Sequence, residues 1–473
     1  MPTTDSDYVH AATRYSSTSV LAACTSLGAE LASNREIIWR TQFGYVTQWA
    51  LSDIARVAMT FGNSHRRRDA TVEDVAVLCA KYNDLATDPA QGDVETIERM
   101  LGLQASMQAD LYSTVTRALG VLSESHEGLR EVAPGWDAEL LGFGLDELTA
   151  SGYLAMAAFL AKKAPVSRSE IETACGWCSM PYTEVAGVME EHLARTSAEQ
   201  RSADNWQSPS PSRRFQPSPL YSRPVVSERD QYAAPAPILI AQKVSLRGLM
   251  YIADERWPER RRRQFAADLG TLFERYIGSQ LDVLHPGRLE PEQVYDGGRR
   301  TVDWVLEFDD LVLLVEVKLF PADQTIRMGG PAAAERLNER LSKALTQIGR
   351  SNELIDARSD IFPGLSRSKH RVGMVVTLDG QPSTSVNFRS RHLPDPGLHW
   401  QLVSAEDLEL LASLPQDRAR SALFRSYSSL TSPHLRKAVS EELENGGGST
   451  NPVIEAAVEN SPLVYSVSRA ALR

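Results

Sequence analysis

Residues 301–318 constrain the fold more than any other part of the sequence. Two apolar, strand-forming runs flank Asp309 and Asp310, residue types that tolerate the left-handed backbone of tight turns. The pattern predicts an antiparallel β-hairpin with a two-residue loop. In that register the numbers of paired residues sum to 619, so Asp303 lies directly opposite Glu316.

Two opposed carboxylates repel each other unless a cation lies between them. Directly paired residues have Cβ atoms about 5 Å apart. Oxygen ligands that converge from two adjacent strands suit a hard divalent cation, Mg²⁺ or Mn²⁺. Lys318 shares a face with Glu316, because side chains alternate along a strand. An ammonium group there can orient a metal-bound water and offset charge that develops on a phosphate.

This Asp…Glu-x-Lys arrangement on a hairpin resembles the PD-(D/E)xK nuclease superfamily, which has the restriction-endonuclease-like fold. The resemblance implies that Asp303 and Glu316 are metal ligands, that the carbonyl of Val317 adds a third, and that Lys318 is the catalytic lysine. The family core runs helix, three strands, helix, strand. Residues 264–378 can be read in that order, with a mixed central sheet flanked by helices.

Residues outside the hairpin extend the resemblance. The first helix of the family often supplies a further acidic residue, and Glu274 matches that role. Gly270 and Gly278 flank it and would let the sheet or a ligand approach closely. In the helix after the hairpin, Lys343 and Gln347 occupy the region where some family members contact phosphate.

The sequence departs from the family pattern at two positions. Val302 stands where the signature proline is found, and Ser351 stands where the exonuclease-like branch has a tyrosine four residues after Gln347. The serine weakens assignment to the exonuclease-like branch but leaves endonuclease and exonuclease action open. By resemblance a DNA endonuclease is the expected class, with DNA preferred over RNA and products that carry 5'-phosphates.

Two basic clusters near the hairpin are candidate contacts to the nucleic-acid backbone. They comprise Arg260, Arg261, Arg262 and Arg263, and Arg299 with Arg300. An alternative for the first cluster is a solvated helix start paired with Asp254, Glu255 and Glu259. Likewise, Lys318 can be read as a simple ion-pair partner of Glu316, and Glu274 as part of a solvated helix face.

Charge divides the chain into two unlike halves. The whole chain has a formal net charge of -11, which would argue against a nucleic-acid partner. Residues 1–200, however, contain 15 Lys and Arg against 27 Asp and Glu, whereas the remainder holds 35 basic and 34 acidic residues. The acidity therefore belongs to the first half, where it favours a basic partner protein.

The chain of 473 residues is too long for one hydrophobic core, so we expect several domains. We predict an all-α acidic domain over residues 1–200, with a possible helix-turn-helix unit at 166–194. A linker with seven prolines follows at 201–237, then the nuclease-like α/β domain at 238–415. A C-terminal helix and a loosely attached tail occupy 416–473.

These features predict a Mg²⁺-dependent nuclease. Its layout resembles restriction or anti-phage effectors, and cutting both strands of a duplex would suit a homodimer. The alternative is an inactive nuclease fold that serves as a nucleic-acid-binding or assembly module. Four scattered cysteines, no export signal and no run of eighteen apolar residues favour a reducing cytoplasm and no membrane.

Overall fold

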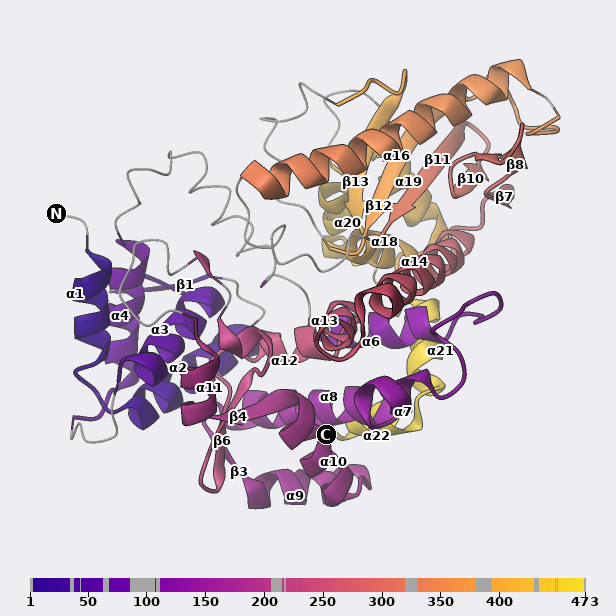
Figure 1. Cartoon of the computed structure of the whole chain (residues 1–473). Helices are drawn as coiled ribbons and strands as arrows, with labels where there is room; N and C mark the ends of the chain where they lie inside the picture. Colours follow the sequence, from indigo (N-terminus) through magenta and orange to yellow (C-terminus); the bar gives the residue numbers. More distant parts are fainter. Residues whose placement is uncertain are drawn as a thin grey trace.

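Figure 1 shows the computed structural model of the chain, which combines helices with mixed β-sheets. It describes residues 3–34, 38–42, 44–62, 68–85, 107, 111–205, 215–216, 218–319, 331–358, 360–379, 393–428, 434–446, 448 and 450–471. Within these ranges no helix has both the length and the apolar character needed to cross a bilayer.

Four helices and a β-hairpin form the N-terminal part. The helices are α1 (Asp5–Ala12), α2 (Ser17–Ser33), α3 (Gln48–Thr60) and α4 (Val72–Asn83). The strands are β1 (Ile38–Thr41) and β2 (Gly44–Thr47), which pair antiparallel. The hairpin contradicts an all-α first half. Its residues are largely β-branched or aromatic, and Gly44 supplies the positive φ of 128° at the start of β2.

Helices also dominate the next segment, but a second sheet runs through it. The helices are α6 (Leu111–Leu122), α7 (Trp136–Leu141), α8 (Leu145–Lys162), α9 (Arg168–Cys178), α10 (Tyr182–Val188), the π-helical η1 (Met189–Leu193) and α11 (Ser197–Ala203). In the N-terminal part, Thr71 and Asp74 form a capping box at the start of α4.

The segment predicted as a linker is built into the second sheet. This sheet has the strand order β3-β6-β5-β4. Its strands are β3 (Val166–Ser167), β4 (Ala194–Thr196), β5 (Val225–Glu228) and β6 (Gln231–Ala233), and the short helix η3 (Pro219–Tyr221) precedes β5. The linker prediction was therefore wrong for residues 218–237. Prolines lie outside both strands, where they remove no ladder hydrogen bond, and Val225 and Val226 are fully buried.

The predicted helix-turn-helix region contains two consecutive helices, α9 and α10. The first of them, α9, continues through Gly176 to Cys178. Ser179 ends it with a left-handed backbone at φ 57°, and Pro181 is the N-cap of α10. The β5–β6 hairpin lies beside this unit, because β6 pairs with β3 immediately before α9.

The second half of the chain is built around a five-stranded mixed sheet with the order β13-β12-β11-β10-β7. The strands are β7 (Arg288–Pro291), β10 (Trp304–Glu307), β11 (Leu311–Lys318), β12 (His370–Thr377) and β13 (His399–Ser404), and a separate small hairpin joins β8 (Val294–Tyr295) to β9 (Arg299–Arg300). Strands β11, β12 and β13 are parallel, whereas β7 and β10 are antiparallel to their neighbours.

Helices cover both faces of this sheet. Helix α16 (Pro331–Ala357) packs on the face formed by Val312 and Leu314. Helix α14 (Glu259–Asp282) packs on the opposite face, formed by Val315 and its neighbours (Figure 1). Other helices in the described part of this half are α12 (Ile238–Lys243), α13 (Leu246–Arg256), α18 (Ala405–Ala412), α19 (Gln416–Tyr427) and α20 (Leu435–Glu444).

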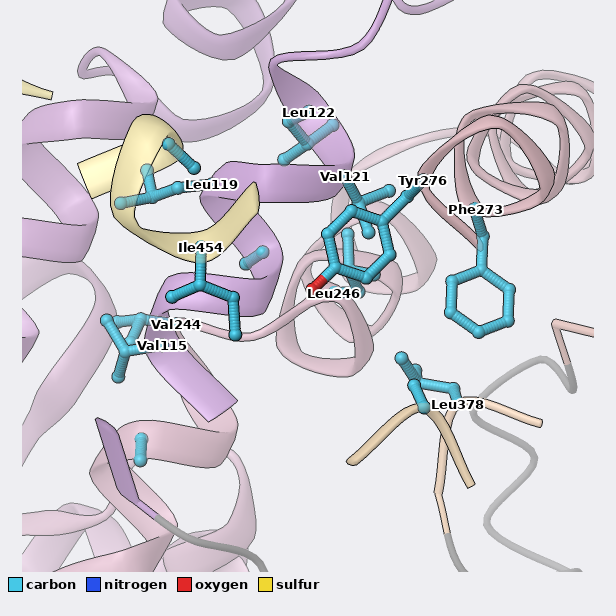
Figure 2. Close-up of a cluster of buried hydrophobic side chains, with 14 of the residues drawn as sticks. Val115, Leu119, Val121, Leu122, Val244, Leu246, Phe273, Tyr276, Leu378 and Ile454 are labelled. Carbon is cyan, nitrogen blue, oxygen red and sulfur yellow. The ribbon is translucent and has the colours of Figure 1, made fainter. Parts of the chain in front are cut away.

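The C-terminal segment is packed, in contrast to the loose tail predicted. It forms α21 (Pro452–Glu459) and α22 (Pro462–Ala471). Figure 2 shows Ile454 of α21 in one cluster with Leu119 of α6 and Tyr276 of α14. Buried apolar residues at three- and four-residue spacing explain why the segment docks.

Candidate active site

The hairpin that carries the predicted site has the expected register. Trp304 pairs with Val315, and the other residue pairs of β10 and β11 follow the same register. The backbone N–H of Phe308 donates to the carbonyl of Leu311 at 2.8 Å, which closes the turn. Asp303 directly precedes β10, so this register places it beside Glu316.

Asp303 is tied to the neighbouring strand through its side chain. Its Oδ2 accepts a hydrogen bond of 2.6 Å from the backbone N–H of Val317, the residue between Glu316 and Lys318. Burial raises the pKa of Asp303, and the nearby Lys318 opposes that rise. The structure therefore brings the predicted Asp, Glu and Lys together at one end of the hairpin.

Glu316 is fully buried. Its Oε1 forms an ion pair with the ammonium of Lys318, and its Oε2 has no hydrogen-bond partner among the described residues. Burial raises the pKa of Glu316 well above its usual range, and the charge of Asp303 adds to this. Burial lowers the pKa of Lys318, but Glu316 and Asp303 more than compensate, so it is raised overall.

Glu274 approaches this group from α14. Burial, and then the charge of Asp303, raise its pKa to about 7. Its backbone carbonyl accepts a 3.0 Å hydrogen bond from the indole N–H of Trp304. Gly278 lies one turn further along α14 and leaves the space that the Trp304 ring fills, so the predicted close approach is found at this glycine. At Gly270 it is not found, because a Cβ there would meet no atom within 4 Å. Glu274 is thus part of the site and not of a solvated helix face.

Glu292 is a carboxylate of the site that the sequence analysis missed. In the β7–β10 register Pro291 pairs with Trp304, so Glu292 follows on the side of Asp303 away from Glu316. Burial raises the pKa of Glu292, Arg300 opposes this, and Asp303 raises it further. No tight turn links β7 to β10, because the β8–β9 hairpin lies between them in the chain, so the sequence alone does not set this register.

The start of β10 is braced by α16. The side-chain amide of Gln347 donates to the carbonyl of Thr301 at 2.6 Å, and the hydroxyl of Ser351 accepts from the N–H of Val302 at 2.9 Å. The two residues that differ from the family pattern, Val302 and Ser351, are therefore partners of each other. Gln347 positions the backbone before Asp303 in this structure, and Lys343 pairs with Glu339 on the exposed side of α16.

The arginine cluster 260–263 does not lie beside the site. It occupies the first turn of α14, and the helical rise places it about 16 to 21 Å along the axis from Glu274. Arg262 pairs with Asp254 and Arg263 with Glu259, which matches the alternative prediction of a solvated helix start with local ion pairs.

Arg261 contributes to packing between the two halves. It pairs with Glu131 and Glu139 of the acidic half and stacks on Trp257 at 3.8 Å. At the site itself Arg300 pairs with Glu292 at 2.9 Å, and Arg299 is exposed on β9. Of the arginines predicted to contact nucleic acid, Arg300 is therefore the one that pairs with a carboxylate of the site.

The acidic half holds α14 in position. The Oδ2 of Asp268 accepts three backbone N–H hydrogen bonds, at 2.6 to 3.1 Å, from residues 130–132. Two turns further along the same helix, Arg275 donates to the backbone carbonyls of Ser125 and Glu127. Because α14 carries Glu274, the first half of the chain helps to set the geometry of the site.

The donor set suits a hard cation. Asp303 and Glu316 offer carboxylate oxygens, one of them buried and without a partner, next to the backbone of Val317. No group of three or more His, Cys, Asp and Glu side chains in the described part of the chain is arranged to hold a metal ion. A cation here would accordingly rest on two carboxylates and complete its shell with carbonyl or water oxygens, as Mg²⁺ commonly does.

Comparisons with known proteins identify no relative. No family model matches the chain, and no curated protein or solved structure is significantly similar to it.

Proposed function

We propose that this protein is a Mg²⁺- or Mn²⁺-dependent nuclease that hydrolyses phosphodiester bonds, most simply a DNA endonuclease. One observation carries the proposal: the Asp303 carboxylate is bonded to the backbone between Glu316 and Lys318. Carboxylates with raised pKa values surround it, an arrangement that costs stability and is typical of functional sites. The same class is supported by the order helix, three strands of the main sheet, helix, strand over residues 259–377, into which the small β8–β9 hairpin is inserted.

The residues have distinct roles in this proposal. Asp303, Glu316 and the Val317 carbonyl hold the cation, which when bound would activate water and polarise the phosphate. Lys318 places an ammonium where it offsets negative charge that develops on the phosphate oxygens. Glu274, with a pKa of about 7, can accept or donate a proton near neutral pH. Arg300 and the exposed Arg299 would contact the nucleic-acid backbone.

Cleavage assays with matched variants test the proposal. Linear, nicked and supercoiled DNA and RNA are incubated with Mg²⁺ or Mn²⁺ and with wild type, Asp303→Asn or Lys318→Met. We expect each variant to lose at least about a hundredfold in rate, the usual effect of removing one charge-stabilising group. Asp309→Asn is the control, because this carboxylate lies on the same hairpin at its exposed turn, paired with Arg420. It should cleave like wild type.

Two results would overturn the assignment. Cleavage that survives both Asp303→Asn and Lys318→Met would place the activity elsewhere or in a contaminant. Alternatively, Mn²⁺ that raises the unfolding temperature of wild type and Asp303→Asn equally would show that Asp303 holds no cation.

A second candidate is a nuclease fold that binds nucleic acid or a protein without cutting. The Lys318–Glu316 ion pair favours it, because the ammonium already neutralises the most buried carboxylate. In that case no substrate is cleaved with either metal, and Asp303→Asn, which removes a buried carboxylate, leaves any nucleic-acid binding unchanged or stronger. The acidic first half would then be the working surface toward a basic partner.

A further inference from the structure

Lys243, the last residue of α12, is an unusual buried cation. Its side chain is 2% exposed, and its Nζ has no hydrogen-bond partner among the described residues. An amine taken out of water without a compensating hydrogen bond costs free energy. Burial lowers its pKa to about 7, with Arg223, Arg195 and Arg256 acting in the same direction and Glu255 against it.

Three arginines on other elements act electrostatically on this lysine. Arg195 comes from β4, Arg223 from the turn before β5, and Arg256 from the end of α13. Each is close enough to Lys243 to disfavour its charged form. None of these elements contributes a residue to the candidate active site.

Three carboxylates accompany these four basic side chains, and one of them, Glu199, acts on Arg195. Arg223 lies 3.8 Å from Glu255, and Arg256 pairs with Glu191. Burial lowers the pKa of Arg223 despite Glu255. Basic groups outnumber acidic ones by four to three, and no described carboxylate is hydrogen-bonded to the Nζ of Lys243, although Glu255 acts on it at longer range.

His192 adds a second orphaned polar atom. The ring is fully buried, its Nε2 lies 2.6 Å from the carbonyl of Leu141 and therefore donates, and its Nδ1 has no partner within the described residues. Burial, and then the neighbouring cations, lower its pKa to about 4. The ring is neutral and adds no charge to the cluster.

We propose that Lys243, Arg195 and Arg223 form a binding site for a phosphate group, at the junction of the helix-turn-helix unit with α12 and α13. A phosphate would give Lys243 a partner and offset the repulsion between the arginines. Guanidinium and ammonium groups together match the several acceptor oxygens of phosphate. A ligand would enter from the side of Arg195, which is half-buried, and Arg256, which is exposed. Free inorganic phosphate and the phosphate of a small nucleotide share this chemistry.

Thermal unfolding of the full-length protein tests the site. The unfolding temperature is followed from about 0.1 to 10 mM inorganic phosphate, or ATP without divalent metal, against chloride of matched ionic strength, a range below the general salting effect of phosphate. Wild type should show a saturable rise. Lys243→Met should need at least about tenfold more ligand, although loss of the unpartnered amine should itself raise the unfolding temperature in chloride. Arg195→Gln, at the partly exposed edge, is a second variant that should fold regardless.

Lys437→Met is the matched control, since Lys437 is exposed on α20, and its response should equal that of wild type. A lower half-saturating concentration for ATP than for phosphate would assign the site to a nucleotide, and equal or higher values to inorganic phosphate. The proposal is wrong if wild type gives no saturable response to either ligand, or if Lys243→Met and Arg195→Gln both respond like wild type.

Discussion

At the scale of single residues, the candidate site combines carboxyl groups whose charged form is disfavoured by burial. Asp303, Glu316, Glu274 and Glu292 all have raised pKa values, and burial is the largest cause for each. Lys318 is the partly buried ammonium among them. Carboxyls that folding makes harder to ionise destabilise the native state as the pH rises.

Glu274→Gln should therefore change the pH dependence of stability in the metal-free protein. The folded-state pKa of Glu274 is raised from 4.5 to about 7, so its contribution to stability is complete below about pH 4.5 and is lost as the pH rises through 7. Relative to the glutamine variant, wild type should lose at most about 3 kcal/mol over that window. Urea unfolding in EDTA at several pH values measures it, and parallel curves for the two proteins would refute the prediction.

A pair of glycines on α14 gives a second prediction at this scale. A Cβ on Gly278 would come within 2.6 Å of Cη2 of Trp304, whereas one on Gly270 would meet nothing. We expect Gly278→Ala to lower the free energy of unfolding by about 2 kcal/mol through overpacking. Gly270→Ala should instead raise it by roughly 0.5 to 1 kcal/mol through helix propensity. Equal effects of the two substitutions in denaturant titrations would contradict the close packing of Trp304 on α14.

At the scale of elements, helix α14 is held from two sides. Its Asp268 and Arg275 bind the backbone of residues 125–132, and its other face covers the sheet. Helix α21 of the C-terminal segment packs in the same region. The Asn451 side chain caps α21 by accepting from the N–H groups of residues 453 and 454, and its amide donates to Gln280 of α14. An element predicted as a loose tail thus contributes to the position of the helix that carries Glu274.

The docking of α21 can be measured with one substitution. Ile454 is 8% exposed and lies against α6, so Ile454→Ala should cost about 2 to 4 kcal/mol of unfolding free energy. Glu459→Ala, on the exposed face at the end of the same helix, should change stability by less than about 0.5 kcal/mol. A cost below 1 kcal/mol for Ile454→Ala in chemical denaturation would show that α21 is not firmly packed.

At the scale of the whole molecule, the two halves are interlocked. The largest hydrophobic cluster runs from Val115 of α6 to Val467 of α22 and includes both α14 and the sheet. Arginines of the second half neutralise carboxylates of the first, as Arg261 does with Glu131 and Glu139. Part of the acidity of residues 1–200 is therefore used inside the molecule, and the boundary at about residue 237 does not separate independent cores.

A buried ion pair across this boundary tests the interlocking. Arg117 of α6 binds Glu409 of α18 through two bonds of 2.5 and 2.6 Å, and Tyr276 of α14 donates to the same carboxylate. Arg117→Met should cost about 3 to 5 kcal/mol, because it leaves the carboxylate buried without a charge partner. The double variant with Glu409→Leu should cost less than the sum of the two single variants. Additive costs in a double-mutant cycle would mean that the halves are not coupled through this pair.

Local pattern determined the elements that could be predicted. Apolar alternation and the Asp309–Asp310 turn set the β10–β11 register, and with it the proximity of Asp303 and Glu316, because pairing in a hairpin is a local property. The helices α14 and α16 and the strands β7, β10, β11 and β12 also follow the order helix, three strands, helix, strand that was expected over residues 264–378, with the β8–β9 hairpin inserted after β7. Likewise, the Thr71 capping box needs only neighbouring residues to form.

What the sequence by itself determined is thus the hairpin, the elements that follow it and the identity of its Asp, Glu and Lys. Only the tertiary structure decided that Glu292 joins them, that Arg261 serves packing, that residues 218–237 form strands and that the C-terminal segment docks. Each of these depends on which distant surface covers an apolar face or pairs a charge. Such long-range pairing is not encoded in the spacing of adjacent residues, because burial and desolvation are properties of the assembled core.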